Sequence, residues 1–411
     1  MLGRQGMTRS AAAILLAAVL VAAAITLALV LVPPRPAPAG LSYRPVAFAD
    51  LPGWAHDDAA AALGAFVRGC DGIDGRPPEA TLGPGPVGRV GDWLPLCRQA
   101  GRLHAAGADA DAVRRFFERH FTPHALRLGR RRDGFLTGYY EPLLEGSRSQ
   151  TERFDIPLYR RPPELVTVDL GQFRADLAGR RVAGRVEGGQ LKPMPDRAAI
   201  DAGALEGRGL ALVWVDDPVE AFFLHSQGSG RVRLRDGSIL RVGYAGPNGH
   251  VYRSIGRLLI DRGAMTADAM SAPALKQWLR DHPAQADALM AQNPSYIFFR
   301  ALSGPDPGPM GALGVALTPG RSLAVDRTRI PLGVPVYLDG HYPDPETQKP
   351  RPLQRLTMAQ DVGGAIRGAL RGDLFWGHGD RAGKIAGHMQ HAARFYVLIP
   401  KQVAKTARET T

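Results

Sequence analysis

The chain has 411 residues, of which 45% are hydrophobic and 22% charged, and its formal net charge is +12. This is the composition of a globular protein long enough for two cores, which excludes a disordered or collagen-like chain. The charge suits an anionic polymer or surface, although a generally Arg-rich composition explains it equally well; without a basic run, zinc-finger spacing or RNA-binding signature, we expect no nucleic-acid partner.

The N-terminal residues form a long apolar segment. Arg4 and Arg9 precede residues 11–32, which contain no charged residue. At a rise of about 1.5 Å per residue, a helix of this length would cross a bilayer core of about 30 Å. The same features fit a secretory signal with a cleavage site at Ala37-Pro38-Ala39. We therefore expect an exported, periplasmic protein with either an N-terminal transmembrane anchor or a cleaved signal peptide.

The two cysteines, Cys70 and Cys97, lie in the part of the chain that would be exported. An oxidising compartment favours a disulfide between them, and two buried free thiols are the alternative. Because neither cysteine is near the apolar segment, we do not expect a lipoprotein.

The following segments change from helical to β-type patterns. Residues 33–55 are rich in Pro and Ala and predict a linker. Residues 57–70 and 109–121 carry apolar residues at helical spacing and predict two amphipathic helices. Residues 133–148 predict strand and loop, and residues 231–246 predict a hairpin around Asp236-Gly237.

The rest of the chain continues this mixture. We predict further strands within residues 210–215, 296–302, 322–340 and 394–400, and helices within residues 254–263 and 266–282. Short strands between Gly- and Pro-rich turns favour barrels over a doubly wound sheet; the many turns agree with 49 glycines and 34 prolines. The polar residues from Lys401 onward predict a frayed tail.

Carboxylates are the candidate catalytic groups. The sequence has no HExxH, GxSxG, Walker loop or GxGxxG unit followed by an acidic residue. The histidines His378, His388 and His391 lack cysteines or clustered carboxylates at ligand spacing, so we expect no metal and no cofactor. Residues 359–380, in contrast, contain three aspartates and six glycines.

Four aspartates are placed to act as acids or bases. Asp361 ends an apolar run and enters a tight Gly-Gly turn, and Asp326 lies inside another apolar run. Asp373 precedes Leu374-Phe375-Trp376, whose apolar surroundings would raise a carboxyl pKa as a general acid requires. Asp380 is the fourth candidate. Each aspartate has a structural alternative as a turn residue or a backbone hydrogen-bond acceptor.

Several separated segments together resemble the lytic murein transglycosylase A family of bacterial enzymes that cut peptidoglycan. They are GYYEP (138–142), FFLHSQGSGRVRL (222–234), GYAGPNGHVYRSIGRLLIDRG (243–263), QNPSYIFF (292–299), SLAVDRTRIPLG (322–333) and the stretch from Gln360 to Gly379. Members of this family are often attached through an N-terminal lipidated cysteine, which this chain lacks.

The resemblance implies a mainly β fold with peripheral helices, of the α+β class. A double-psi β-barrel catalytic domain would comprise residues 41–140 and 295–400, with the three-aspartate domain in its C-terminal part. A second, smaller β-barrel domain would be inserted at residues 141–294, and the substrate would lie in the groove between them. Residues 1–40 would be anchor and linker, and residues 401–411 a tail.

The resemblance also implies an activity on peptidoglycan glycan strands by a protein that we expect to be a monomer. The β-1,4 bond between N-acetylmuramic acid and N-acetylglucosamine would be cut without water, leaving a 1,6-anhydro sugar. Asp361 would be the catalytic acid, supported by Asp326 and Asp373. The alternatives are a hydrolase on the same scaffold and a non-catalytic wall-binding protein.

Five further residues are candidates for substrate contact. Aromatic faces suit the CH surfaces of sugars, and Gln and Ser supply hydrogen bonds. The candidates are Tyr139, Tyr140, Gln227, Ser229 and Trp376. Packing or turn formation is the alternative role for each.

Overall fold

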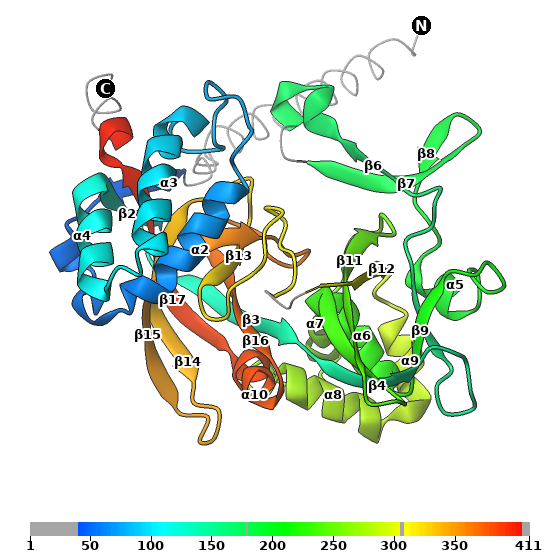
Figure 1. Cartoon of the computed structure of the whole chain (residues 1–411). Helices are drawn as coiled ribbons and strands as arrows, with labels where there is room; N and C mark the ends of the chain where they lie inside the picture. Colours follow the sequence, from blue (N-terminus) through cyan, green and yellow to red (C-terminus); the bar gives the residue numbers. More distant parts are fainter. Residues whose placement is uncertain (1–39, 178–179, 305–307, 405–411) are drawn as a thin grey trace, which may run out of the picture. The chain divides into compact units, whose positions relative to one another are not determined.

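The structure is a computed structural model that describes residues 40–177, 180–304 and 308–404 (Figure 1). Its largest sheet has eight strands in the order β1-β2-β17-β14-β15-β13-β16-β3. Because β17 also pairs with β3, the six strands from β17 round to β3 close into a ring. The strands are β1 (Leu41–Pro45), β2 (Phe121–Leu128), β3 (Gly134–Glu141), β13 (Ser322–Val325), β14 (Pro335–Pro343), β15 (Pro350–Asp361), β16 (Arg371–His378) and β17 (Gln390–Pro400).

Two neighbouring strand pairs of the ring are parallel, namely β13 with β15 and β16 with β3. Parallel neighbours need a crossover connection, so they unite segments that are distant along the chain. Here the register sets Thr137 opposite Asp373. The core of the ring contains fully buried side chains from several strands, among them Leu136, Leu323 and Leu374.

Three helices of the N-terminal half pack beside the ring: α2 (Ala59–Asp71), α3 (Val90–Ala105) and α4 (Ala110–His120). The carboxylates of Asp58 and Asp109 cap α2 and α4 by accepting backbone N–H groups. The buried rings of Phe66, Phe116 and Phe117 meet edge to face between these two helices. The two helices predicted here are therefore confirmed, whereas α3, which contains Pro95, was not predicted.

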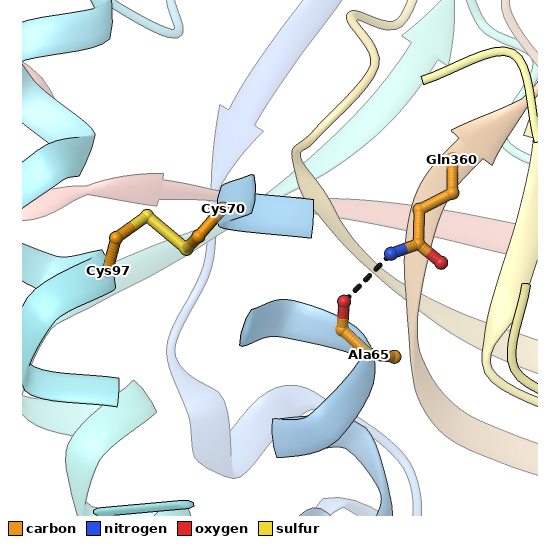
Figure 2. The surroundings of a disulfide bond; sticks show 4 residues. All are labelled: Ala65, Cys70, Cys97 and Gln360. Atoms are coloured by element: carbon orange, nitrogen blue, oxygen red, sulfur yellow. Dashed lines mark hydrogen bonds between the residues drawn. A yellow bond between two sulfur atoms is a disulfide. The ribbon is translucent and has the colours of Figure 1, made fainter. Parts of the chain in front are cut away.

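A disulfide joins Cys70 in α2 to Cys97 in α3 (Figure 2). Their Cα atoms are 5.6 Å apart and the two residues are 27 positions apart in sequence. Closing a loop of this size restricts the unfolded chain and so stabilises the folded one. Helix α2, which packs against β15, is thereby covalently joined to α3.

A second sheet has six strands in the order β12-β11-β10-β4-β9-β5. A single bridge between Arg160 and Phe299 links its two ends. The strands are β4 (Leu143–Ser147), β5 (Ile156–Tyr159), β9 (Ala211–Val215), β10 (Ser229–Leu234), β11 (Ile239–Pro247) and β12 (Ile297–Leu302). The predicted hairpin around Asp236-Gly237 is confirmed as β10 and β11.

Smaller elements surround the six-stranded sheet. They are a three-stranded sheet of β6 (Val166–Asp169), β7 (Arg181–Glu187) and β8 (Gln190–Lys192), and the helices α5 (Arg197–Asp201), α6 (Pro218–Gln227), α7 (Ile255–Asp261), α8 (Ala272–Asp281) and α9 (Pro283–Met290). A last helix, α10 (Asp380–His388), follows β16 in the ring.

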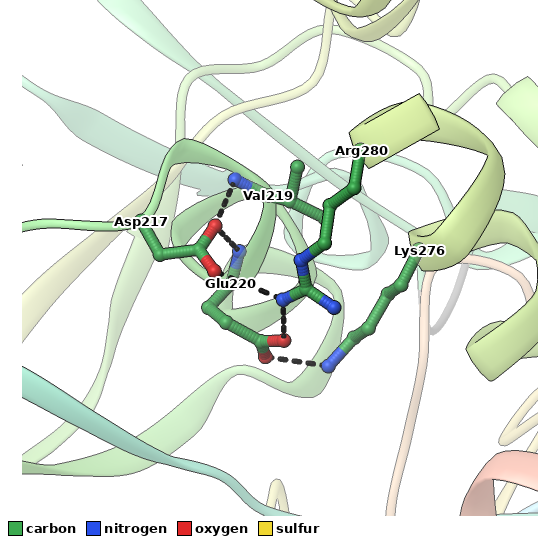
Figure 3. Close-up of polar contacts among 5 residues, drawn as sticks. All are labelled: Asp217, Val219, Glu220, Lys276 and Arg280. Atoms are coloured by element: carbon green, nitrogen blue, oxygen red, sulfur yellow. Dashed lines mark hydrogen bonds and ion pairs between the residues drawn. The ribbon is translucent and has the colours of Figure 1, made fainter. Parts of the chain in front are cut away.

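An ion-pair network fixes α6 against α8 (Figure 3). Asp217 caps α6 by accepting the N–H groups of Val219 and Glu220. Its other oxygen binds Arg280 of α8 at 2.9 Å, and Arg280 and Lys276 both reach Glu220. This network holds α6, whose last residue is Gln227.

The chain passes from the ring to the six-stranded sheet through Pro142, between β3 and β4. At this crossing the buried carboxylate of Glu141 pairs with Arg231 of β10 at 3.2 Å. The return crossing follows β12, because β12 pairs with β11. Sheet membership therefore places that crossing after residue 302.

Three local predictions differ from the structure. The predicted linker contains β1, which pairs with β2, and its Tyr43 hydroxyl binds the Arg329 carbonyl. The helix predicted from residue 266 begins only at Ala272, because Ser271 caps it. Residues 401–404 are helical rather than frayed, and Gln402 donates to the carbonyl of Asp92.

In the described ranges, no helix combines the length and the apolar character that crossing a bilayer requires. The apolar segment 11–32 and the cleavage site at residues 37–39 lie outside the described residues.

Candidate active site

Strand register brings two of the predicted carboxylates into one row. Ala324 of β13 pairs with Asp361 of β15 on one side and with Asp373 of β16 on the other. Asp373 in turn pairs with Thr137 of β3. Residues that are directly opposite on neighbouring strands point to the same face of a sheet. The two carboxylates therefore flank the small side chain of Ala324 on one face. Their Cα atoms are two strand spacings apart, about 10 Å measured across the sheet.

A β-bulge directs Asp361 to this face. Leu323 pairs with Ala359 and Ala324 pairs with Asp361, so Gln360 is an extra residue on β15. Without it, the alternation of side chains would set Gln360 opposite Ala324 and turn Asp361 to the other face.

The bulge residue itself is fully buried and hydrogen-bonded. The Nε2 of Gln360 donates to the carbonyl of Ala65 in α2 at 2.8 Å (Figure 2), and its Oε1 accepts the Ser322 hydroxyl. The backbone carbonyl of Gln360 accepts the N–H of Leu313. The disulfide-bonded helix α2 thus holds the strand end that carries Asp361.

Asp361 is half-buried and accepts two hydrogen bonds. The hydroxyl of Tyr139 donates to Oδ2 at 2.8 Å, and the backbone N–H of Ala312 donates to Oδ1 at 2.9 Å. Burial raises the pKa of this carboxyl, and hydrogen bonds from Tyr139, Ala312 and the backbone of Val362 oppose the rise without cancelling it. Asp361 consequently holds a proton at higher pH than an ordinary aspartic acid.

Asp373 is held differently. The hydroxyl of Thr137 donates to its Oδ1 at 2.6 Å, while Arg371 donates to that hydroxyl oxygen at 2.8 Å. Burial raises the pKa of Asp373 to about 6; Arg371 and Thr137 act against this rise, and the charge of Asp361 adds to it. Asp373 therefore also keeps its proton to a higher pH than an ordinary aspartic acid.

Asp326 has a structural role in this arrangement. Its buried carboxylate accepts the N–H and the hydroxyl of Thr328 on one oxygen and the N–H of Gly368 on the other, at 2.8 Å. Burial raises its pKa, but these hydrogen bonds, together with the charge of Arg367, outweigh that effect and the pKa is lowered. Asp326 is therefore ionised and holds the loop that follows Asp361 against the end of β13.

Of the five predicted substrate contacts, the structure brings Tyr139 to Asp361. The backbone N–H of Tyr140 donates to Oε1 of Gln227, and its ring lies so close to Gly383 of α10 that a Cβ atom there would be tightly crowded. Gln227 ends α6, Gly228 follows with φ +79°, and Ser229 is buried at the start of β10. The hydrogen bond to Gln227 thus fixes the end of β3 to the end of α6.

Trp376 lies away from the carboxylates. It alternates with Phe375, which shares a small apolar cluster with Tyr139 and Ala324. The Trp376 indole N–H donates to the sulfur of Met389, and its ring centre is 5.1 Å from that of Tyr342. The structure therefore places Trp376 against the core of the ring.

Sequence reasoning missed four residues that hold the carboxylates: Thr137, Ala312, Gln360 and Arg371. Thr137 precedes Tyr139 by two positions on a strand, so period-two alternation could have indicated it. Ala312 acts through its backbone and leaves no signal in the sequence. Across the described ranges, no group of three or more His, Cys, Asp or Glu side chains is arranged to hold a metal ion.

Comparisons with known proteins match this architecture. Residues 135–300 match the family model of the MltA specific insert domain, and residues 321–399 match that of the 3D domain. The chain is 36% identical over 266 residues to the membrane-bound lytic murein transglycosylase A of Escherichia coli strain K12. That match covers 64% of each chain, so it spans slightly less than two thirds of the relative's length.

Solved structures extend the likeness to most of the chain. A membrane-bound lytic murein transglycosylase from Agrobacterium tumefaciens has a TM-score of 0.77 and 37% identity, covering 89% of this chain and 99% of that one. E. coli MltA with bound chitohexaose has a TM-score of 0.63 and 28% identity, covering 89% of this chain and 95% of that one. These matches confirm the predicted fold class.

Proposed function

We propose that this chain, which belongs to the family of membrane-bound lytic murein transglycosylases, cleaves peptidoglycan glycan strands without consuming water. The bond cut is the β-1,4 link between N-acetylmuramic acid and N-acetylglucosamine, and the product ends in 1,6-anhydromuramic acid. The observation that carries the proposal is the half-buried Asp361, aimed by a bulge at the row it shares with Asp373, with a raised pKa. The chitohexaose bound by the E. coli relative supports a glycan as substrate.

The reaction needs one proton donor that later becomes the acceptor. Protonated Asp361 donates to the glycosidic oxygen, and the bond to C1 of the muramic sugar breaks. Positive charge develops on C1 and the ring oxygen, where ionised Asp373 stabilises it electrostatically. The 6-hydroxyl of the same sugar then attacks C1 and gives its proton to Asp361. No water enters, and the acid is regenerated.

The intramolecular nucleophile explains why a single acid–base residue suffices. A hydroxyl already attached to the reacting sugar has a large effective concentration at C1. A hydrolase would instead need a second carboxylate to activate water. Tyr139 and Ala312 fix the orientation of Asp361, and Asp326 fixes the loop after it.

Product analysis tests the proposal. Sacculi digested with the purified protein should release muropeptides that are lighter by one water than the corresponding hydrolysis products, as mass spectrometry would detect. Intact reducing ends would identify a hydrolase. If no soluble product appeared while the protein still sedimented with sacculi, it would be a non-catalytic wall-binding protein.

Substitution of the proposed acid gives the matching test. Asp361→Asn should lower the rate of sacculus solubilisation by about 10²–10⁴-fold, because proton transfer is lost while binding is kept. Asp380→Asn, which changes an exposed carboxylate at the start of α10, should keep the wild-type rate. Wild-type activity in folded Asp361→Asn would show that another group is the acid.

We also propose that the protein is exported and attached to a membrane through residues 11–32, or released by cleavage after Ala39. The name of the E. coli relative, which is membrane-bound, supports attachment. N-terminal sequencing of the mature protein distinguishes the two forms.

A further inference from the structure

A turn with three consecutive arginines joins β2 to β3. This basic turn comprises residues 129–132, and Arg130, Arg131 and Arg132 are all exposed. Backbone hydrogen bonds between Leu128 and Arg131 close it in both directions, at 3.0 and 3.1 Å. Its backbone is therefore fixed, while its three arginines remain accessible from the solvent.

The positive charge of the basic turn is not balanced by its neighbours in the chain. Asp133 follows the turn directly, but its carboxylate pairs with Arg394 of β17 at 3.2 Å. Arg131 donates to the backbone carbonyl of Asp133 and not to its carboxylate. Among the described residues, the side chains of Arg130 and Arg132 have no hydrogen-bond or ion-pair partner. The turn therefore presents a surplus of positive charge that an anionic ligand can reach.

Large apolar side chains flank the basic turn on both sides. Leu128, which precedes it, is 37% exposed, and Phe135, which follows it, is 42% exposed. The guanidinium carbon of Arg371 lies 5.1 Å from the centre of the Phe135 ring. Arginines beside exposed Leu and Phe are typical of surfaces that bind a bilayer, because the apolar groups enter the interface and the charges meet lipid phosphates.

Strand register sets the basic turn beside the point where the N-terminal residues join the fold. Leu41 is the first residue of β1, and it pairs with Leu128, the last residue before the turn. Only residues 33–40 separate β1 from the apolar segment 11–32. An extended chain covers at most about 3.5 Å per residue, so residues 33–40 reach at most about 28 Å. A membrane spanned by residues 11–32 would therefore lie within reach of the basic turn.

We propose that the basic turn, together with Leu128 and Phe135, is a contact surface for anionic phospholipid headgroups. The inference rests on the proposed attachment through residues 11–32. A negatively charged leaflet attracts each arginine near it, and the attraction falls off within a Debye length of about 10 Å, so the short connection to the anchor favours the contact. Contact at the turn would fix the orientation of the ring of strands on the membrane, because the ring would then be held at two places.

Trypsin, which cleaves after accessible arginines, tests the contact on the full chain. The protein is reconstituted in vesicles of phosphatidylcholine, or of phosphatidylcholine and phosphatidylglycerol in equal amounts, and cleavage after Arg131 is followed by mass spectrometry. The anionic vesicles should slow this cleavage about tenfold relative to the neutral ones. Arg235, exposed at the turn between β10 and β11, is the control site, and its cleavage rate should be the same in both vesicles.

The variant Arg130→Gln/Arg132→Gln removes two charges from the basic turn and keeps Arg131 as the cleavage site. In this variant, cleavage after Arg131 should be nearly as fast in anionic as in neutral vesicles, because the attraction to the leaflet is reduced. Arg148→Gln/Arg300→Gln is the matched control, since it removes two exposed arginines from the inserted region. It should keep the wild-type protection of Arg131.

Equal cleavage of wild-type Arg131 in the two kinds of vesicle, or protection that survives in Arg130→Gln/Arg132→Gln, would overturn the inference. Protection by sacculi and not by anionic vesicles would assign the basic turn to the wall polymer instead. Flotation of the protein with phosphatidylcholine vesicles reports the anchor by itself, so failure of the proposed attachment is seen separately. A lack of protection in anionic vesicles contradicts the inference with or without a working anchor.

Discussion

At the residue scale, the surroundings of two carboxyls decide their protonation. Asp361 ends its strand and receives donors from Tyr139 and Ala312, whereas Asp373 lies within β16 and receives the hydroxyl of Thr137. Burial raises the pKa of both, and for Asp373 to about 6. Burial therefore favours the protonated form of both carboxyls, as a general acid requires.

The hydroxyl of Tyr139 should lower the pKa of Asp361. It stabilises the ionised form of Asp361, so its removal in Tyr139→Phe should raise the pKa of Asp361 further. The alkaline limb of the profile of kcat/KM against pH should then move up by at most about one unit.

The control is Tyr43→Phe, whose hydroxyl binds a backbone carbonyl elsewhere. Its alkaline limb should not move. A downward shift in Tyr139→Phe would contradict the assignment of this hydrogen bond.

Asp373 should make stability depend on pH. Its pKa is raised from 3.8 to about 6 in the folded protein, so its contribution to stability is full below about pH 4 and is lost as the pH rises through 6. The free energy of unfolding, measured with urea, should fall between pH 4 and pH 8 by about 2 kcal/mol less in Asp373→Asn than in the wild type. Parallel curves for the two proteins would refute the raised pKa.

At the scale of elements, the direction of Asp361 depends on the contact between α2 and β15. Gln360 has no exposed surface, and its side chain bonds both Ala65 of α2 and Ser322 of β13. The disulfide between Cys70 and Cys97 fixes α2 to α3 behind this contact. Helix α2 thus helps to hold the bulge that turns Asp361 to the face it shares with Asp373.

Gln360→Leu should test this contact. It leaves the Ala65 carbonyl and the Ser322 hydroxyl without their partner, which should cost about 1–3 kcal/mol of unfolding free energy. It should also lower kcat more than it raises KM, because the position of the acid changes. Gln354→Leu on the same strand, which removes a hydrogen bond to Asp339, should leave kcat unchanged. If Gln360→Leu were destabilised but kept the wild-type kcat, the bulge would have no influence on catalysis.

At the scale of the whole molecule, charge and topology act together. The ring of strands supplies the carboxylates Asp361 and Asp373, and the net charge of the chain is +12. Peptidoglycan bears peptide carboxylates, so part of its affinity for this protein should be electrostatic.

Salt should therefore weaken binding to the wall. Sedimentation of the Asp361→Asn variant with sacculi should fall several-fold as NaCl rises from about 0.05 to about 0.5 M, because the screening length shortens. Binding of uncharged chitohexaose should change much less over the same range. Salt-independent sedimentation would show that the net charge has no part in wall binding.

The sequence by itself determined the elements whose signals are local. The helices around Phe66 and Phe116, the hairpin at Asp236-Gly237 and the mainly β character follow from periodicity and turn chemistry, and the structure confirms them. Its separated motifs also identified the family. The helices and the hairpin depend mainly on residues that are close together in the sequence.

Tertiary structure alone decided which carboxylates meet. The row of Asp361, Ala324 and Asp373 depends on the register of three strands and on one extra residue at position 360, and neither is encoded in spacing along the chain. In the same arrangement of strands, the carboxylate of Asp326 accepts backbone N–H groups and the side chain of Trp376 packs against the core. The pairing of strands that are distant in sequence sets these side-chain directions, because a shift of one residue in register turns each side chain to the other face of the sheet.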